Sequence, residues 1–196
     1  MSAALDLPVP MSLTEFLVWD APDGARWQLI DGQPHAMAPA SPVHGAIQNE
    51  VGRLLGNHLR GRGTPCRAVA NPGVRIELRP DMNYRIPDLA VTCAPLVPGD
   101  PMLPDPVLLV EILSPSNPAE TWMNVWAYTT IPSVREILVI RTDAAGAQVL
   151  RRKPDGTWPY APDVVEGDVI LDSIGFRVPL AAIYAGTWLA EGIPVR

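Results

Sequence analysis

Two short apolar runs in the middle of the chain each carry one acidic residue. The first run, residues 85–93, holds Asp88, and the second, residues 106–114, holds Glu111. Both runs are rich in Val, Ile and Leu and are bounded by Pro, Gly and Asp, which is typical of buried strands in a mixed sheet. We therefore expect both acids inside or at the end of core strands, where a carboxylate without a partner costs roughly several kcal/mol.

Two carboxylates on neighbouring strands suit a hard cation, because the cation offsets their mutual repulsion. Mg²⁺ is commonly held by one or two carboxylates together with water and phosphate oxygens, so Asp88 and Glu111 predict a phosphodiester hydrolase site. An alternative stays open in which the acids are structural. Asp88 would then be a turn residue that begins a strand after Pro87, and Glu111 would pair with Arg75 or Arg85.

The part of the chain before Asp88 is predicted to contain two helices, a hairpin and two strands. A capping box of Ser12 and Glu15 indicates a short helix, and the long helix from Ser41 has His44 in its first turn. We interpret His44 more readily as a hydrogen-bonded structural residue than as a ligand. The other expected elements are a hairpin over residues 26–37 turning at Asp31-Gly32, the end of the long helix near Leu59, and strands over 66–70 and 73–79.

After Glu111 the pattern alternates between helix and strands. A helix is expected from Pro118 to about Thr130, followed by strands over 136–140 and 148–152. A further hairpin is expected at Asp155-Gly156, strand and turn over 169–178, and a closing helical turn over 180–185. This order predicts an α/β fold with a mixed sheet flanked by helices, an N-terminal hairpin and a C-terminal β extension.

Composition and length favour one well-buried domain spanning residues 1–196. Hydrophobic residues make up 47% of the chain and charged residues 18%. No apolar run approaches the ~20 residues of a membrane span, so we expect a soluble, cytoplasmic protein without membrane contact. The net charge of -6 counts against strong non-specific binding to nucleic acid. Local basic strips remain possible at Arg53, Arg60, Arg62 and Arg67, or at residues 151–153.

The two cysteines, Cys66 and Cys93, have neither a disulfide framework nor a CxxC spacing. We expect both to be small buried hydrophobic residues with reduced thiols, and neither to bind a metal.

Several short motifs are spread over nearly the whole chain: Leu29-Ile30-Asp31-Gly32, His44-Gly45, Ile86-Pro87-Asp88, residues 111–116 and Ile183-Tyr184-Ala185-Gly186. Together they resemble the Uma2 family (DUF820-type), which belongs to the PD-(D/E)XK restriction-endonuclease-like superfamily. The resemblance implies a restriction-endonuclease-like fold in which Asp88 and Glu111 bind Mg²⁺ or Mn²⁺.

The chain departs from the family pattern at the residue that assists the attacking water. The superfamily places a lysine two residues after the Glu, where this chain has Leu113. The family often moves that lysine to the next helix, four residues before a Tyr and four after an Asp. With Tyr128 matched to that Tyr, Asn124 stands at the lysine position and Glu120 at the Asp position. Gln28 also stands where family members usually carry a glutamate.

The resemblance therefore implies a Mg²⁺-dependent endonuclease with Asp88, Glu111, Glu120 and Asn124 in its site, acting on nucleic acid and with DNA as the expected partner. A homodimer is expected because a chain with one site needs a partner to cut both strands. The alternative is a binding or regulatory module that retains the fold without the chemistry, because Leu113, Asn124 and Gln28 each replace a charged residue. The sequence leaves open the choice between DNA and RNA and any recognition sequence.

Overall fold

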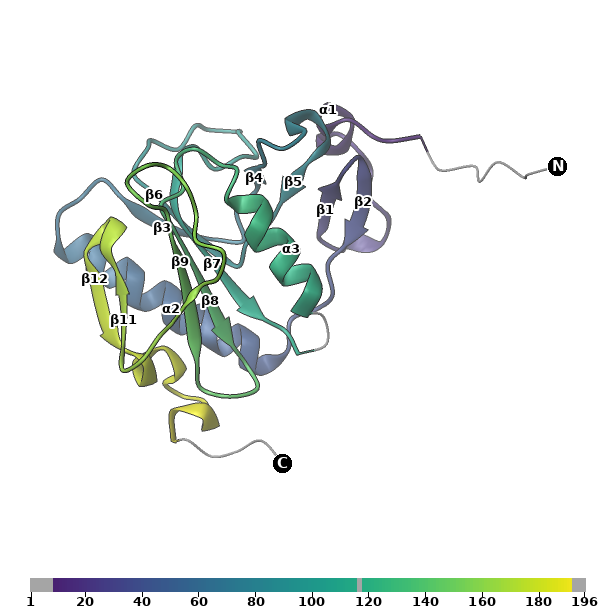
Figure 1. Cartoon of the computed structure of the whole chain (residues 1–196). Helices are drawn as coiled ribbons and strands as arrows, with labels where there is room; N and C mark the ends of the chain where they lie inside the picture. The colour runs from purple at the N-terminus through teal and green to yellow at the C-terminus, as the bar shows by residue number, and fades with distance from the viewer. Residues whose placement is uncertain (1–8, 116–117, 192–196) are drawn as a thin grey trace.

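The structure of the protein, a computed structural model, describes residues 9–115 and 118–191 (Figure 1). The helices are α1 (Leu13–Leu17), α2 (Pro42–Gly61) and α3 (Pro118–Tyr128). The strands of the main sheet are β3 (Arg67–Ala70), β6 (Leu89–Thr92), β7 (Pro106–Leu113), β8 (Glu136–Arg141), β9 (Ala147–Arg151) and β10 (Asp163–Val164). Two smaller sheets contain β1 (Trp27–Ile30), β2 (Gln33–Ala36), β4 (Val74–Arg75) and β5 (Tyr84–Arg85) in one and β11 (Asp168–Leu171) and β12 (Phe176–Pro179) in the other.

The main sheet has the strand order β10-β9-β8-β7-β6-β3 and is mixed, as predicted. Strands β7 and β8 run parallel, whereas the other described pairings in this sheet are antiparallel. Parallel neighbours require a crossover connection, and α3 lies in the segment that joins β7 to β8. This crossover places α3 beside the strand that carries Glu111.

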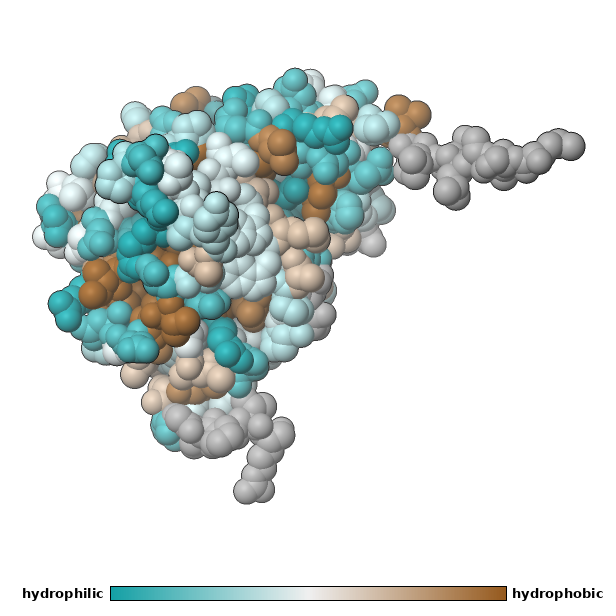
Figure 2. All heavy atoms as spheres, viewed as in Figure 1, coloured by the Kyte–Doolittle hydropathy of each residue, from teal (hydrophilic) through white to brown (hydrophobic). Residues whose placement is uncertain are grey.

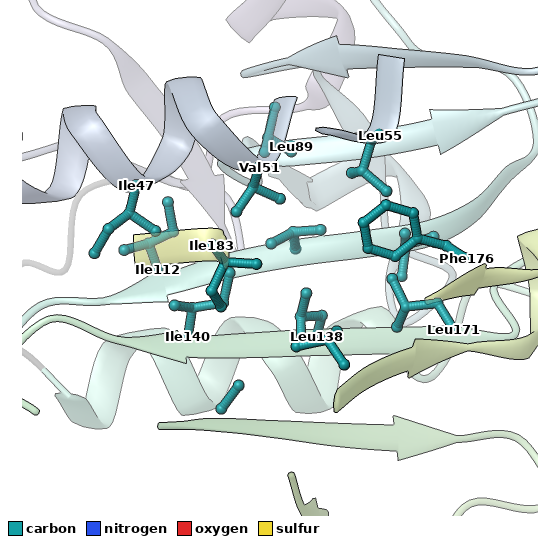
Figure 3. Packing of buried hydrophobic residues seen from close by; sticks show 14 of the residues in the cluster. Ile47, Val51, Leu55, Leu89, Ile112, Leu138, Ile140, Leu171, Phe176 and Ile183 are labelled. Atoms are coloured by element: carbon teal, nitrogen blue, oxygen red, sulfur yellow. The ribbon is translucent and has the colours of Figure 1, made fainter. Parts of the chain in front are cut away.

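Helices cover both faces of the main sheet (Figure 1). Helix α2 begins after its N-cap Ser41, whose side chain accepts a hydrogen bond from the backbone N–H of His44. Its residues Ile47, Val51 and Leu55 recur at four-residue steps and pack on one face of the sheet together with the β11–β12 hairpin (Figure 3). The opposite face packs against α3 through a cluster that includes Val125, Tyr128, Ala90, Leu109 and Val139.

The four-stranded sheet, ordered β2-β1-β5-β4, lies between α1 and α3. Leu29 of β1 pairs with Tyr84 of β5, and both pack against α1. Alternation along a strand turns the next residues of the two strands, Gln28 and Arg85, to the other face. That face meets α3, because Val74, the partner of Arg85 in β4, packs in the same cluster as Val125.

The capping box, the Asp31-Gly32 hairpin and the strand over 106–114 are confirmed, but three expected strand features are wrong. The expected strand over 85–93 is divided between β5 and β6, because Pro87 lacks a backbone donor and the chain there passes from the small sheet to the main one. The strand over 73–79 is only Val74–Arg75 long, and Arg79 has a positive φ of 51°. Asp155-Gly156 forms a turn without flanking strands.

The prediction that Cys66 and Cys93 are reduced is wrong in this structure, because they form a disulfide. Cys66 immediately precedes β3 and Cys93 immediately follows β6. These strands are antiparallel, with Arg67 opposite Thr92, so one further step along the ladder brings the two cysteines face to face. Spacing along the chain does not reveal a register of this kind.

The outer surface facing the viewer in Figure 2 is mostly hydrophilic or intermediate in hydropathy, and hydrophobic side chains gather over the β11–β12 hairpin. Within residues 9–115 and 118–191, no helix combines the length and apolar character that a membrane crossing needs.

Candidate active site

Asp88 and Glu111 meet where β6 begins and β7 nears its end. Leu89 pairs with Val110, so the antiparallel register puts Asp88 directly opposite Glu111. Their carboxyl groups share a hydrogen bond, and the two residues are only 8% and 7% exposed. Burial, and then the nearby charge of Asp88, raise the pKa of Glu111 well above its usual range. A site that brings two acids this close must hold a proton between them or a cation beside them.

The carboxylate of Asp88 is held from two sides. Its Oδ2 accepts a 2.7 Å hydrogen bond from the backbone N–H of Ile112 and lies 3.2 Å from Nε2 of His44. Asp88 therefore connects the first turn of α2 to β7, and its orientation is fixed by groups on both elements.

Glu111 is held by α3. The hydroxyl of Tyr128 donates a 2.6 Å hydrogen bond to Oε1 of Glu111, which lowers the pKa of Glu111 and so opposes the effect of burial. Tyr128 is fully buried, and burial together with the charge of Glu111 raises the pKa of Tyr128 well above its usual range. Tyr128 consequently remains a hydrogen-bond donor. Neither Arg75, which pairs with Glu77 at 3.6 Å, nor Arg85 forms an ion pair with Glu111 in the described residues.

Asn124 lies one helical turn before Tyr128 and is 6% exposed. Its Nδ2 is 3.4 Å from Oε1 of Gln28, and the same oxygen accepts a hydrogen bond from the backbone N–H of Ile86. The Oδ1 atom of Asn124 is buried and has no hydrogen-bond partner among the described residues. Two of the three positions at which the chain departs from the family pattern, Gln28 and Asn124, are thus in contact as a neutral pair of amides.

Glu120 lies one further turn toward the start of α3 and is half-buried. Its charge contributes to raising the pKa of Glu111 and also raises the pKa of Arg85, so Glu120 is within electrostatic range of both. It is not among the residues that line the cleft described next.

A cleft of about 510 Å³ opens beside the acid pair. It is bounded by the segment after β2, the start of α2, and the ends of β7 and β8. Its polar lining residues include Arg26, Ser41, His44, Gln48, Asn71, Asp88, Ser114 and Thr142. Glu111 is not among the lining residues, so the cleft reaches the acid pair through Asp88.

His44 is the cleft residue that the sequence analysis assigned to a structural role. It is 13% exposed at its side chain, lines the cleft and contacts Asp88, and its Nδ1 is buried without a partner among the described residues. The available signal was its place in the His44-Gly45 motif at the start of α2, because the N-terminus of a helix favours nearby negative charge such as that of Asp88. Gln48, one turn later, donates hydrogen bonds to Oδ1 of Asn71 and to the backbone carbonyl of Asp88.

The acid pair fits Mg²⁺ or Mn²⁺ in its donor chemistry, because both ligands are carboxylate oxygens. No group of three or more His, Cys, Asp and Glu side chains able to hold a metal occurs within the described ranges. A cation on Asp88 and Glu111 would therefore complete its coordination with water, backbone or substrate oxygens, which is how Mg²⁺ is usually bound.

The site contains no lysine. The chain has a single lysine, Lys153. Lys153 follows β9, whose last residue Arg151 pairs with Glu136 at the start of β8, whereas the cleft lies beyond the other end of β8 at Thr142. The only lysine is therefore at the opposite end of the strands of the main sheet.

A mixed sheet with helices on both faces and two acids on adjacent strands defines a restriction-endonuclease-like fold. Comparison with known proteins agrees: residues 13–181 match the Uma2 family, described as "Putative restriction endonuclease", and the chain belongs to this family. A protein of Synechocystis sp., described as "Uncharacterized protein slr1290", is 29% identical over 182 residues, which are 91% of this chain and 94% of that protein.

A solved structure has the same fold. It is a crystal structure from Anabaena variabilis described as "a putative nuclease belonging to DUF820", with a TM-score of 0.70 and 17% sequence identity. The match covers 90% of this chain and 98% of that one.

Proposed function

We propose that this protein is a Mg²⁺-dependent endonuclease that hydrolyses phosphodiester bonds of nucleic acid, with DNA as the expected substrate. The observation that carries the proposal is the cross-strand pair of Asp88 and Glu111, buried beside the cleft and sharing a hydrogen bond. A pair of this kind is poorly stable with both acids ionised and is relieved by a divalent cation.

In this proposal Asp88 and Glu111 hold the cation, which when bound lowers the pKa of a bound water and offsets phosphate charge. His44 and the backbone N–H of Ile112 orient Asp88, and Tyr128 orients Glu111. The unpartnered Oδ1 of Asn124 is available to accept a hydrogen bond from the attacking water. Glu120 adds negative charge within electrostatic range of Glu111.

The direct test is cleavage of single- and double-stranded DNA and RNA with and without Mg²⁺ or Mn²⁺. Asp88→Ala is the blank for contaminating nuclease, and Asp81→Ala, which removes an exposed carboxylate, is the matched control. We expect cation-dependent cleavage by wild type and Asp81→Ala, and a loss of about 10²-fold or more in Asp88→Ala. Wild-type cleavage equal to the Asp88→Ala blank on all four substrates would sink the proposal.

A binding or regulatory module is the second candidate. The observation that favours it is the neutral contact between Gln28 and Asn124, together with Leu113 at the other lysine position. Without a charged group at either lysine position, the acids would serve as a scaffold for a cation or for hydrogen bonds. In that case wild type binds nucleic acid in a gel-shift assay, and Asp88→Ala binds it equally well, while neither cuts it.

We also propose that a working nuclease of this kind acts as a homodimer, because one site per chain cuts one strand. Sedimentation equilibrium measures the mass directly. A monomer under conditions that produce double-strand breaks would contradict this part of the proposal.

A further inference from the structure

The absence of a lysine from the site leaves the source of positive charge beside the acids unassigned. Phosphodiester cleavage builds negative charge on the reacting phosphate, and a fixed cation nearby stabilises it. The only lysine is at the far end of the strands of the main sheet, so a fixed side-chain cation that replaces it would be an arginine. Arg85, three residues before Asp88, is placed to do so.

Strand pairing directs Arg85 toward α3. Leu29 pairs with Tyr84, so the next residues along the ladder, Gln28 and Arg85, lie side by side on one face of the small sheet. Gln28 contacts Asn124 of α3 across that face. Arg85 therefore lies beside the amide pair that occupies the family's lysine position.

Arg85 has few partners for a buried cation. It is 6% exposed, one terminal nitrogen donates to the backbone carbonyl of Leu29, and its Nε is buried without a hydrogen-bond partner among the described residues. A guanidinium buried in this way is destabilising unless nearby negative charge compensates it.

The carboxylates that compensate the charge of Arg85 are Glu120 of the candidate site and Asp31 in the β1–β2 turn. Burial lowers the pKa of Arg85, and its electrostatic interactions with Tyr128, Asp31 and Glu120 raise it again. Arg85 is therefore electrically coupled to the site through two residues of α3.

We propose that Arg85 is a positioning residue that supplies from β5 the fixed positive charge that family members place on α3 as a lysine. It acts through Tyr128 and Glu120 and does not contact the substrate. Its effect on cleavage rests on the proposed nuclease function, but its effect on cation binding does not.

The test removes the charge of Arg85 and measures two quantities with opposite expected signs. Arg85→Gln should bind Mn²⁺ about tenfold more tightly, because a repelling charge is lost, yet should cleave at least about tenfold more slowly. Arg85→Lys, which keeps the charge, should retain wild-type Mn²⁺ affinity. Arg75→Gln removes an exposed arginine from the neighbouring strand and controls for net charge; it should change neither quantity.

A second variant tests whether the two cations are interchangeable. Adding Asn124→Lys to Arg85→Gln returns a positive charge to the same space from α3. The double variant should bind Mn²⁺ as weakly as wild type and should cleave at the wild-type rate. This double variant also keeps the test decisive if Arg85→Gln alone folds poorly, because both its melting temperature and its Mn²⁺ affinity should return to the wild-type values.

The outcomes separate the two proposals. The role of Arg85 would be overturned if Arg85→Gln bound Mn²⁺ more weakly than wild type. It would also be overturned if Arg85→Gln matched wild type in both Mn²⁺ affinity and cleavage rate. Wild type that binds Mn²⁺ without cutting would end the nuclease proposal, and the direction of the affinity change would still decide the role of Arg85. Wild type that binds no Mn²⁺ would overturn both.

Discussion

The hydroxyl of Tyr128 donates a 2.6 Å hydrogen bond to Oε1 of Glu111, so the crossover helix α3 directly holds the acid on β7. This bond lowers the pKa of Glu111, against burial and the charge of Asp88, which raise it. The state of the acid pair therefore depends on a residue one turn after Asn124 on the same helix.

Tyr128→Phe should raise the pKa of Glu111 further, because it removes the donor and leaves burial unchanged. A proton would then compete more strongly with a cation, so Mn²⁺ affinity measured against pH should reach its plateau at a higher pH than in wild type. We also expect a loss of about 1 kcal/mol in the free energy of unfolding. An unchanged midpoint of the affinity profile would show that the bond does not control the protonation of Glu111.

Glu111→Gln should stabilise the cation-free protein at neutral and alkaline pH. The pKa of Glu111 is raised above its ordinary 4.5 in the folded state, so its contribution to stability is fully present below about pH 4.5 and is lost as pH rises through the raised value. The advantage of Glu111→Gln in urea unfolding should therefore grow with pH, to on the order of 2 kcal/mol.

Saturating Mg²⁺ should narrow this difference by stabilising wild type alone, because a ligand that binds only the folded state stabilises it. Asp81→Asn, at an exposed position, is the control for net charge. A stability difference that is constant between pH 4 and pH 9 would contradict the assignment.

Gln28 and Asn124 should tolerate charge only when both are changed. Asn124→Lys alone places a buried ammonium opposite a neutral amide and beside Arg85, and should cost about 2 kcal/mol of stability. Adding Gln28→Glu supplies a carboxylate at the position that now contacts Asn124, and should recover most of that loss. Thermal unfolding of both single variants and the double variant measures the coupling, and strict additivity would argue against a direct contact.

The Cys66–Cys93 disulfide closes a loop across a sequence separation of 27 residues. On chain-entropy grounds, replacing both cysteines by serine should lower the free energy of unfolding by about 3.5 kcal/mol. A reducing agent should lower the melting temperature of wild type to that of the double variant and leave the variant unchanged. Two titratable thiols in unfolded, unreduced wild type would show instead that the thiols are free.

Local signals in the sequence were sufficient for much of the fold. The capping box of Ser12 and Glu15, the Asp31-Gly32 turn and the N-cap Ser41 act over a few residues, and each lies where it was expected. The two acids were also recognisable, because each interrupts an apolar run. The pattern predicted only that they lie on neighbouring strands, and the register now places them in hydrogen-bond contact.

Contacts set by register between distant strands could not be predicted in this way. The disulfide follows from the pairing of β3 with β6, and the position of Arg85 follows from the pairing of β1 with β5. His44 reaches Asp88 only because α2 packs across the sheet with its first turn at the end of β7. Each of these depends on residues more than 20 positions apart, which periodicity along the chain does not relate.

Lys153 lies at the end of the main sheet's strands that is far from the cleft, and this has a consequence for regulation. Acetylation of a lysine removes its charge, and in a protein with a lysine in its active site that modification switches off the chemistry. In this chain the only lysine side chain is remote from the cleft. The arginine side chains near the cleft carry guanidinium groups, which acetylating reagents do not modify. An acyl donor that inactivates lysine-bearing relatives would leave this site intact.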